Sequence, residues 1–418
     1  MSGPSTQTVA AAPVPEPRSP LRDPAFLRLW AGSTASGLAT WAMPFVLGLA
    51  LLDGTVTAAA LGLVLATRTA GFLAAVVVGG VLADRYSRRA VVWWAGLAAG
   101  LASPVLAAGV GRSVPVMALA GVVIGAGQGA CRPAFQALTA EVVAAPLRQR
   151  ANAALTLSVR VTTLTGPGLA ALLAAFLSVP ALLLGMGLLW LAAAALPPRG
   201  RHAPAPGPVP GERTGFVTEF VSEFVDGVRE ARRHPWFLAG LGALAAVITT
   251  GYSATGVLLP LVSRDRYGVE AVLVAATTAY TAGALLGALV VARWHPRSAG
   301  WAALAGLAVY GLAPLSLWLP APAALVVAAY ALAGVGIELF NVPWFTATQR
   351  EVEPRLLARV SALDFLVSYG LAPVGLALIA PAADAFGPGP VLAVCAAVCF
   401  LAPAAAALVP SARRFSGR

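Results

Sequence analysis

Long apolar segments alternate with short polar segments along almost the whole chain. Twelve of the apolar segments reach the roughly 20 residues that an α-helix needs to cross a lipid bilayer. They lie at 29–52, 59–83, 90–110, 115–140, 152–177, 180–197, 237–262, 269–292, 299–319, 323–347, 360–382 and 388–410. The pattern predicts an all-α integral membrane protein with twelve transmembrane helices.

Composition agrees with a membrane protein and excludes a soluble domain of this size. Apolar residues make up 59% of the 418 residues and charged residues only 11%, which is too little charge to cover a soluble surface. The cysteines Cys131, Cys395 and Cys399 fall in apolar spans and the histidines are dispersed, so we expect no disulfide and no metal site. There is no nucleophile–base set and no nucleotide-binding loop. We therefore expect neither an enzyme nor a bound cofactor.

All 28 basic residues are arginine, and they are divided unevenly between the two sides of the membrane. An even number of spans puts both termini on one side, and 22 arginines fall on that side, against three on the other. Basic loops stay in the cytoplasm. We therefore expect a multi-pass protein of the cell membrane with both termini cytoplasmic. The net charge of +11 is then a topology signal and does not indicate nucleic-acid binding.

The spans form two sets of six, separated by the longest polar segment. We expect a disordered tail at 1–26, a first bundle at 27–197, a linker at 198–235, a second bundle at 236–410 and a tail at 411–418. In the linker, Phe216, Phe220 and Phe224 recur every four residues beside charged residues. This spacing predicts an amphipathic helix on the cytoplasmic membrane surface. A partner-binding helix is the alternative.

The two halves repeat weakly at an offset of 208–210 residues. Matching pairs are Pro133 and Pro343, Phe135 and Phe345, Glu141 and Glu351, and Arg85 and Arg293. Six spans per repeat is an even number, so the halves are expected to be parallel and pseudo-symmetric about an axis along the membrane normal.

A short charged loop between the second and third spans carries the most informative motif. It reads Gly79-Gly80-Val81-Leu82-Ala83-Asp84-Arg85-Tyr86-Ser87-Arg88-Arg89. This pattern resembles the loop between helices 2 and 3 of the major facilitator superfamily of transporters. The resemblance implies two six-helix bundles, the major facilitator fold, with transport by alternating access to a central cavity. In the second half, Ala292 stands where Asp84 would be, so the first copy is the more complete.

The resemblance also implies a gate at this loop. Its acid, here Asp84, contacts the start of helix 11 and a neighbouring arginine and closes the cytoplasmic side. The members of this gating motif are Gly80, Asp84, Arg85, Arg88 and Arg89. The alternative is that the arginines only set the topology.

Two further resemblances narrow the family. Gly166-Pro167-Gly168 in the fifth span is similar to the Gly-Pro signature of proton-coupled antiporters, although Ala170 and Ala171 replace flanking glycines. The segments at 132–138 and 344–349 resemble the drug:proton antiporter branch that includes macrolide-efflux and enterobactin-exporter proteins. This implies a monomer that exports an amphipathic small molecule, such as a drug, siderophore or secondary metabolite, in exchange for protons. An uptake permease and a non-transporting sensor are the alternatives.

Glu338 is the acid deepest within a predicted span, which makes it the candidate proton carrier. A charge at mid-bilayer costs about 2.5–3.5 kcal/mol, so we expect Glu338 to face the cavity. Glu338 aligns with Gln128 in the repeat, and Arg132 lies one turn from Gln128. We therefore expect Glu338 and Arg132 to approach each other and protonation to release their contact. A structural carboxylate that is permanently paired with arginine is the alternative.

Arg68 and Arg160 are the other charges within spans. Either could balance Glu338 or bind an anionic group of the cargo, and Arg68 could also snorkel. The remaining substrate-cavity candidates are Trp41, Trp344 and Asn341, with packing as the alternative for the tryptophans. Asp364 lies near a span end, where we expect it to cap the helix or pair with an arginine.

Overall fold

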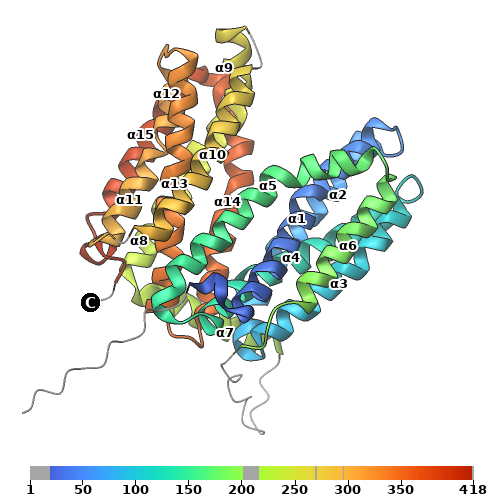
Figure 1. The fold of residues 1–418 in the computed structure, drawn as a ribbon. Helices are drawn as coiled ribbons and strands as arrows, with labels where there is room; N and C mark the ends of the chain where they lie inside the picture. The colour runs from blue at the N-terminus through green and yellow to red at the C-terminus, as the bar shows by residue number, and fades with distance from the viewer. Residues whose placement is uncertain (1–18, 201–215, 269–270, 295, 417–418) are drawn as a thin grey trace, which may run out of the picture.

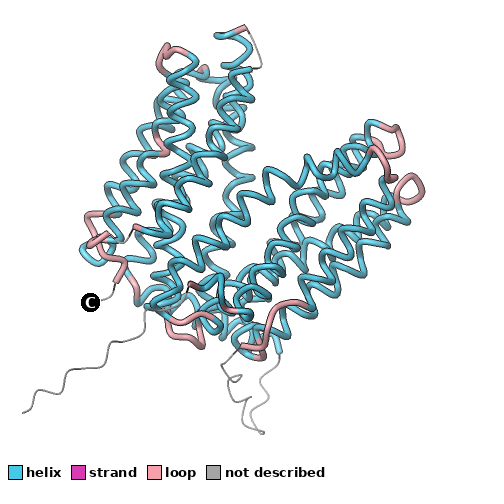
Figure 2. Tube along the Cα trace, in the orientation of Figure 1, coloured by secondary structure: helices cyan, strands magenta, loops and turns pink. Residues whose placement is uncertain are grey.

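The chain folds into two bundles of helices joined by a linker. The computed structural model describes residues 19–200, 216–268, 271–294 and 296–416. The bundles lie together at one end and diverge toward the other (Figure 1). Only turns and loops connect the helices, and no strand occurs in the described ranges (Figure 2).

Six helices form the first bundle. They are α1 (Pro24–Leu52), α2 (Ala58–Arg85), α3 (Arg88–Gly109), α4 (Val114–Val142), α5 (Arg148–Ala174) and α6 (Val179–Ala195). Helix α4 packs between α2 and α3, while α1 packs against α5 and α6. Short 3₁₀ turns precede α1 at Pro20–Arg22 and α5 at Ala145–Leu147.

The second bundle is formed by the remaining long helices. They are α8 (Pro235–Val247), α9 (Ser253–Tyr267), α10 (Ala271–Arg293), α11 (Ala299–Val309), α12 (Leu312–Trp318), α13 (Ala323–Glu351), α14 (Leu357–Phe386) and α15 (Pro388–Ala406). A π-helical turn at Ile248–Tyr252 joins α8 to α9, so together they make one span. Helices α11 and α12 likewise form the ninth span, and a 3₁₀ turn at Pro410–Arg413 follows α15.

The predicted membrane architecture is confirmed. Eleven helical segments of the described ranges are long and apolar enough to cross a membrane, and Val179–Ala195 is a shorter apolar helix at the sixth predicted span. The first helix begins at Pro24, inside the tail predicted over 1–26, and residues 1–18 lie outside the described ranges. Asp23 explains this start, because its side chain accepts a hydrogen bond from the backbone N–H of Ala25 and proline suits the first helical position.

Glycines bring helices into backbone contact in both bundles. A Cβ atom at Gly125 of α4 would lie 1.9 Å from the carbonyl oxygen of Arg68 in α2. In the second bundle, a Cβ atom at Gly334 of α13 would lie 2.0 Å from the carbonyl oxygen of Tyr280 in α10. Only glycine permits such an approach. These contacts hold α2 against α4 and α10 against α13. Helices α2 and α10 also contact the opposite bundle.

The linker contains the expected helix, α7 (Phe216–Arg233), at the junction of the bundles (Figure 1). It packs against α14, α8 and α2, and its expected place at the membrane surface stays a prediction. A Cβ atom at Gly227 would lie 2.8 Å from the Cβ atom of Arg359, so this glycine lets α7 approach the start of α14 closely. The helix therefore meets protein from both bundles.

The bundles contact each other mainly through α14 with α2 and α4 and through α5 with α10 and α13. We call the end where α2 ends, α5 begins and α14 begins the arginine-rich end. The polar contacts described below join the bundles toward this end, whereas the arms separate toward the opposite end (Figure 1).

Candidate functional site at the bundle interface

Asp84 links the last turn of α2 to the first turn of α14. Its carboxylate accepts hydrogen bonds from the backbone N–H groups of Ala358 at 3.2 Å and Arg359 at 2.9 Å. The side chain of Asp84 is fully buried. A carboxylate at a helix start satisfies free N–H groups and interacts favourably with the helix dipole. Asp84 thus joins the two bundles.

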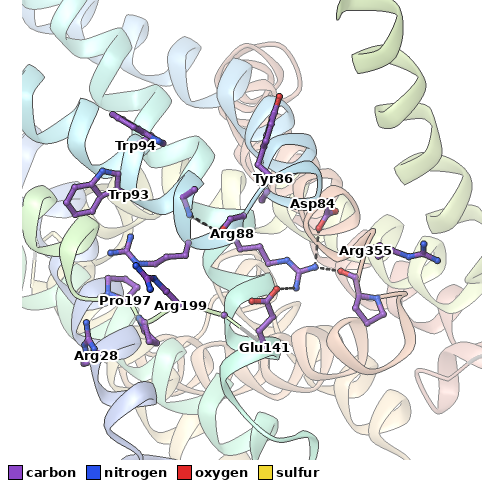
Figure 3. A pocket seen from close by; sticks show the side chains of 17 residues that line it. Arg28, Asp84, Tyr86, Arg88, Trp93, Trp94, Glu141, Pro197, Arg199 and Arg355 are labelled. Carbon is purple, nitrogen blue, oxygen red and sulfur yellow. Dashed lines mark hydrogen bonds and ion pairs between the residues drawn. The ribbon is translucent and has the colours of Figure 1, made fainter. Parts of the chain in front are cut away.

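Arg88 extends this junction to two more segments (Figure 3). Its guanidinium lies 3.2 Å from the carboxylate of Asp84 and 2.7 Å from that of Glu141 on α4. It also donates a hydrogen bond to the carbonyl oxygen of Pro354, in the loop before α14. We refer to Asp84, Arg88, Glu141 and the start of α14 as the latch. Glu141 was not among the predicted gating residues, although its match with Glu351 in the repeat is a signal that could have found it.

The other members of the predicted motif take different positions. A Cβ atom at Gly80 would lie 2.5 Å from the Cβ atom of Ala362, so α2 and α14 touch here. The guanidinium carbon of Arg85 lies 5.7 Å from the ring centroid of Tyr86. Arg89 instead donates to the carbonyl oxygen of Ala195 at 3.2 Å, at the end of α6. Gly80 therefore belongs to the interface, whereas Arg89 contacts its own bundle.

A set of amide side chains forms a second junction, between α5 and α13. Asn152 donates to the side-chain oxygen of Gln349 at 3.0 Å, and Gln349 donates to that of Gln136 at 3.1 Å. Arg148 donates to the backbone carbonyl of Gln349 at 2.8 Å. Gln149 reaches the backbone carbonyl of Val291 in α10 at 2.7 Å. Sequence reasoning missed this junction, because amides near span ends resemble ordinary loop residues.

Glu338 forms a buried ion pair with Arg160. Atoms Nη2 and Nε of Arg160 lie 2.5 Å and 2.6 Å from Oε1 of Glu338. The side chain of Glu338 is fully buried and that of Arg160 is 22% exposed. The second carboxylate oxygen, Oε2, is buried and has no hydrogen-bond partner. The pair joins α5 to α13, so it crosses the boundary between the bundles.

The expected contact between Glu338 and Arg132 does not form, because Glu338 pairs with Arg160 instead. Arg132 of α4 lies with its guanidinium carbon 5.8 Å from the ring centroid of Tyr369 on α14. The repeat correctly aligned the depths of Gln128 and Glu338 along their helices, but depth does not determine which neighbouring helix a side chain faces. Arg68 and Arg160 were the other arginines that could balance Glu338, and Arg160 is the one that pairs with it.

The remaining polar candidates gather in the first bundle. Arg68 donates to the side-chain oxygen of Gln128 at 2.6 Å and to the carbonyl oxygen of Thr40 at 3.3 Å. The Nε atom of Arg68 is buried without a partner, and the charge of Arg132 is near enough to repel that of Arg68. Within the described ranges, neither arginine forms an ion pair with a carboxylate.

The next candidates are Trp41, Asn341 and the Gly-Pro signature of α5. Trp41 of α1 is half-buried, and its Cβ atom would lie 3.5 Å from a Cβ atom built at Gly166 of α5. Pro167 follows within α5, and the helix continues through it. Asn341 is half-buried on α13, about one turn from Glu338. The Gly-Pro signature thus lies where α5 passes α1.

Trp344 is not a cavity residue. Its side chain is 1% exposed and stacks on Phe237 and Phe340, with ring centroids 4.9 Å and 5.3 Å away. The ring of Phe415, from the end of the chain, lies 5.6 Å from it. Phe415, from the segment predicted as a tail at 411–418, therefore packs into the second bundle, where it covers Trp344.

Asp364 was also misjudged from the sequence. It lies seven residues inside α14, is 4% exposed, and accepts a hydrogen bond of 3.5 Å from the hydroxyl of Ser368. It neither caps the helix nor pairs with an arginine in the described ranges. Asp364 is thus a further buried acid, in addition to Asp84 and Glu338. No group of three or more metal-ligating side chains occurs in the part of the chain that the structure describes.

Comparisons with known proteins give the family. The family model described as Major Facilitator Superfamily matches residues 29–376. No curated protein sequence matches the chain. The human organic anion transporter MFSD10 (TETRAN) has a similar structure, with a TM-score of 0.76 and 14% identity over 92% of this chain and 99% of that chain.

Two other solved structures are similar over nearly their full length. A bacterial homologue of the iron transporter ferroportin, in its outward-facing state with soaked iron, has a TM-score of 0.70 and 17% identity, over 92% of this chain and 99% of that chain. The proton:xylose symporter XylE, bound to 6-bromo-6-deoxy-D-glucose, has a TM-score of 0.68 and 13% identity, over 94% and 96%. Family and neighbours indicate a transporter and not an enzyme. This chain of two helical bundles belongs to the Major Facilitator Superfamily.

Proposed function

We propose that this transporter exports an amphipathic small molecule in exchange for protons, and that Glu338 carries the proton. The observation that supports this proposal is the buried pair of Arg160 and Glu338 across the bundle boundary. An exchanger needs a group whose charge state changes the contact between its two halves. Glu338 meets this requirement from the middle of its helix, whereas Asp84 lies at the end of α2.

Protonation of Glu338 removes the charge that holds Arg160. Breaking a buried pair by neutralising one partner costs about 3–5 kcal/mol, because the other charge stays buried and uncompensated. The free atom Oε2 is a position at which a proton can bind. The protonated form therefore favours a state in which α5 and α13 separate, so that the arginine-rich end opens.

The arginine distribution supports an orientation for this cycle. With 22 arginines on the side of both termini, we infer that the arginine-rich end faces the cytoplasm of the cell membrane. The described state is then closed toward the cytoplasm and diverges toward the outside. A proton taken up from outside would neutralise Glu338, open the cytoplasmic side and be released there when cargo binds. We propose that the monomer carries out this cycle.

The intramembrane charges favour a cargo with an acidic group. Arg68 and Arg132 lie on α2 and α4 without a carboxylate partner in the described ranges. An anionic group on the cargo would compensate these charges better than a neutral cargo could. MFSD10, described as an organic anion transporter, is a structural neighbour with this kind of cargo. The apolar residues of the spans suit the rest of an amphipathic molecule.

Proton movement in everted membrane vesicles tests the proposal. An acid interior is established, a panel of lipophilic acids, antibiotics and siderophores is added, and collapse of the gradient is recorded. We expect particular compounds to collapse the gradient with the wild type and with Asp226→Asn, a variant of an exposed acid on α7. Glu338→Gln should abolish the response. Equal responses of Glu338→Gln and wild type would refute its role.

Proton-coupled uptake is the second candidate, since XylE is a proton:xylose symporter with the same fold. The same vesicles separate the two directions. An exporter accumulates labelled cargo inside everted vesicles when the interior is acid, whereas a symporter moves cargo out of them together with protons.

A further inference from the structure

A pocket of about 870 Å³ lies at the arginine-rich end, beside the latch (Figure 3). Its walls come from the starts of α1 and α3, the segment after α6 and the loop before α14. Arg28, Arg89 and Arg199 each come from a different one of the first three segments. Figure 3 shows Arg28, Pro197 and Arg199 near one another, on the opposite side of the pocket from Arg355. The pocket thus has a basic side.

The three arginines form a cluster of positive charge. Arg28 and Arg199 are near enough to Arg89 to repel its charge. In the described ranges, none of the three forms an ion pair with a carboxylate. Three neighbouring cations without a counter-charge cost free energy that a bound anion would recover.

Hydrogen bonds within the bundle use only some of the donors of this cluster. Arg28 donates to the carbonyl oxygen of Leu196 at 3.0 Å, and Arg89 donates to that of Ala195 at 3.2 Å. These bonds satisfy the end of α6. A guanidinium has five N–H donors, and the Nη1 atom of Arg89 is buried without a partner. The cluster therefore retains donors for an anion.

The acids that line the pocket do not neutralise the cluster. Asp84 is engaged by Arg88 and by the start of α14, and Glu141 is engaged by Arg88. Arg355, on the opposite wall, pairs with Glu353. The pocket thus has a paired side, which contains the latch, and an unpaired basic side.

The position of the pocket favours a lipid as the source of the anion. Trp93 and Trp94, which also line it, are 39% and 66% exposed, and tryptophan is enriched where membrane helices meet the lipid headgroups. The guanidinium carbon of Arg89 lies 5.4 Å from the ring centroid of Trp93. Further along α3, Leu101 and Val105 are 60% and 46% exposed. This is an apolar surface along which acyl chains can lie.

We propose that Arg28, Arg89 and Arg199 bind the phosphate of an anionic phospholipid headgroup. The wall opposite this cluster includes Pro354, whose carbonyl oxygen accepts a hydrogen bond from Arg88 across the bundle boundary. The pocket is complete only while the latch is closed. A bound headgroup therefore stabilises the closed arginine-rich end.

Native mass spectrometry of the purified full chain tests this site, with phosphatidylglycerol and phosphatidylcholine as probes. We expect tighter binding of phosphatidylglycerol. The triple variant Arg28→Gln, Arg89→Gln, Arg199→Gln should lose about a hundredfold in its affinity, at about fivefold per arginine. The control triple Arg22→Gln, Arg150→Gln, Arg232→Gln removes the same charge from exposed positions outside the pocket. It should bind phosphatidylglycerol as the wild type does.

A single variant controls for the possibility that the pocket triple variant misfolds. Arg199 makes no hydrogen bond within the described ranges, so Arg199→Gln should fold normally and still lose about fivefold. Equal losses in both triples, or no loss in Arg199→Gln and the pocket triple, would overturn the proposal. Binding of inorganic phosphate as tightly as phosphatidylglycerol would also overturn it, because the pocket would then bind a free anion without any preference for a lipid.

Discussion

The carboxylate of Asp84 accepts a hydrogen bond of 2.9 Å from the backbone N–H of Arg359, across the boundary between the two bundles. One side chain therefore caps α14 from the opposite bundle and also pairs with Arg88 at 3.2 Å. The contact can exist only while α2 and α14 lie together. Any state that opens the arginine-rich end must break it.

Loss of the Asp84 side chain should open this end. We expect Asp84→Ala to lose a helix cap worth about 1–2 kcal/mol and to weaken the hold on Arg88. Asp84→Asn keeps a capping group but loses the charge, so its effect should be smaller. The readout is maleimide labelling of Ser361→Cys, a conservative replacement that is buried near the start of α14. Asp226→Ala, at an exposed acid of α7, should label no faster than its parent. Equal labelling of all variants would contradict the role of Asp84.

A side chain at Gly80 should prevent closure in a similar way. Its Cβ atom would lie 2.5 Å from the Cβ atom of Ala362 and 2.8 Å from the carbonyl oxygen of Ala358. We expect Gly80→Ala to destabilise the closed state by about 1–3 kcal/mol, as overpacking does. The control is Gly62→Ala on the same helix, where nothing lies within 4 Å of the new atom. Labelling of Ser361→Cys should rise only with Gly80→Ala, and a rise with both would argue against a specific contact.

The pair of Arg160 and Glu338 should show strong energetic coupling. Arg160→Gln leaves a buried carboxylate unpaired, at a cost of about 3–5 kcal/mol. The double variant Arg160→Gln, Glu338→Gln leaves no charge, so it should be more stable than the sum of the single changes implies. Thermal unfolding in detergent of the four proteins measures this. Additive effects would mean that the two side chains do not depend on each other.

The end of the chain should contribute to the stability of the second bundle. Phe415 is fully buried against Trp236, Phe340 and Trp344. We expect Phe415→Ala to cost about 3–5 kcal/mol, as for other buried aromatic residues. Phe386→Ala removes the same side chain from a position that is 74% exposed and should have little effect on the unfolding temperature. An unchanged unfolding temperature in Phe415→Ala would show that the segment is not part of the core.

The spans and the two bundles could be predicted because apolar length is sufficient to locate a membrane helix. The charged loop with Asp84 could be found because its spacing is specific. The partner of Glu338 could not be predicted. A sequence repeat gives the position of a residue along its helix, but it does not give the rotation of that helix against its neighbours. The amide junction of Asn152 and Gln349 was missed because amides near span ends resemble ordinary loop residues.

The packing of Trp344 against Phe415 also could not be predicted from the sequence. Trp344 could have faced either a cavity or the core, and the choice depends on Phe415. That residue comes from a short segment without helical periodicity, and its backbone has a φ of 49°. Such a turn packs through long-range contacts, for which a single sequence gives no local signal.

The central claim, that protonation of Glu338 releases the bundles, can be tested without knowing the cargo. Spin labels at Trp94→Cys and Arg414→Cys report the distance between exposed positions on the two bundles at the arginine-rich end. A second pair, at Leu52→Cys and Val274→Cys, reports the opposite end. The native Cys131, Cys395 and Cys399 are buried, so the introduced residues should be labelled selectively. Asp364→Asn removes another buried acid, which has no arginine partner in the described ranges, and serves as the matched control.

The decisive measurement is the distribution of these distances in the wild type, Glu338→Gln and Asp364→Asn at one neutral pH, because glutamine has the shape and zero charge of a protonated glutamate. In Glu338→Gln, we expect a longer distance at the arginine-rich end and a shorter distance at the opposite end than in the wild type. Asp364→Asn should show the wild-type distribution. A Glu338→Gln protein with the wild-type distribution would contradict the account.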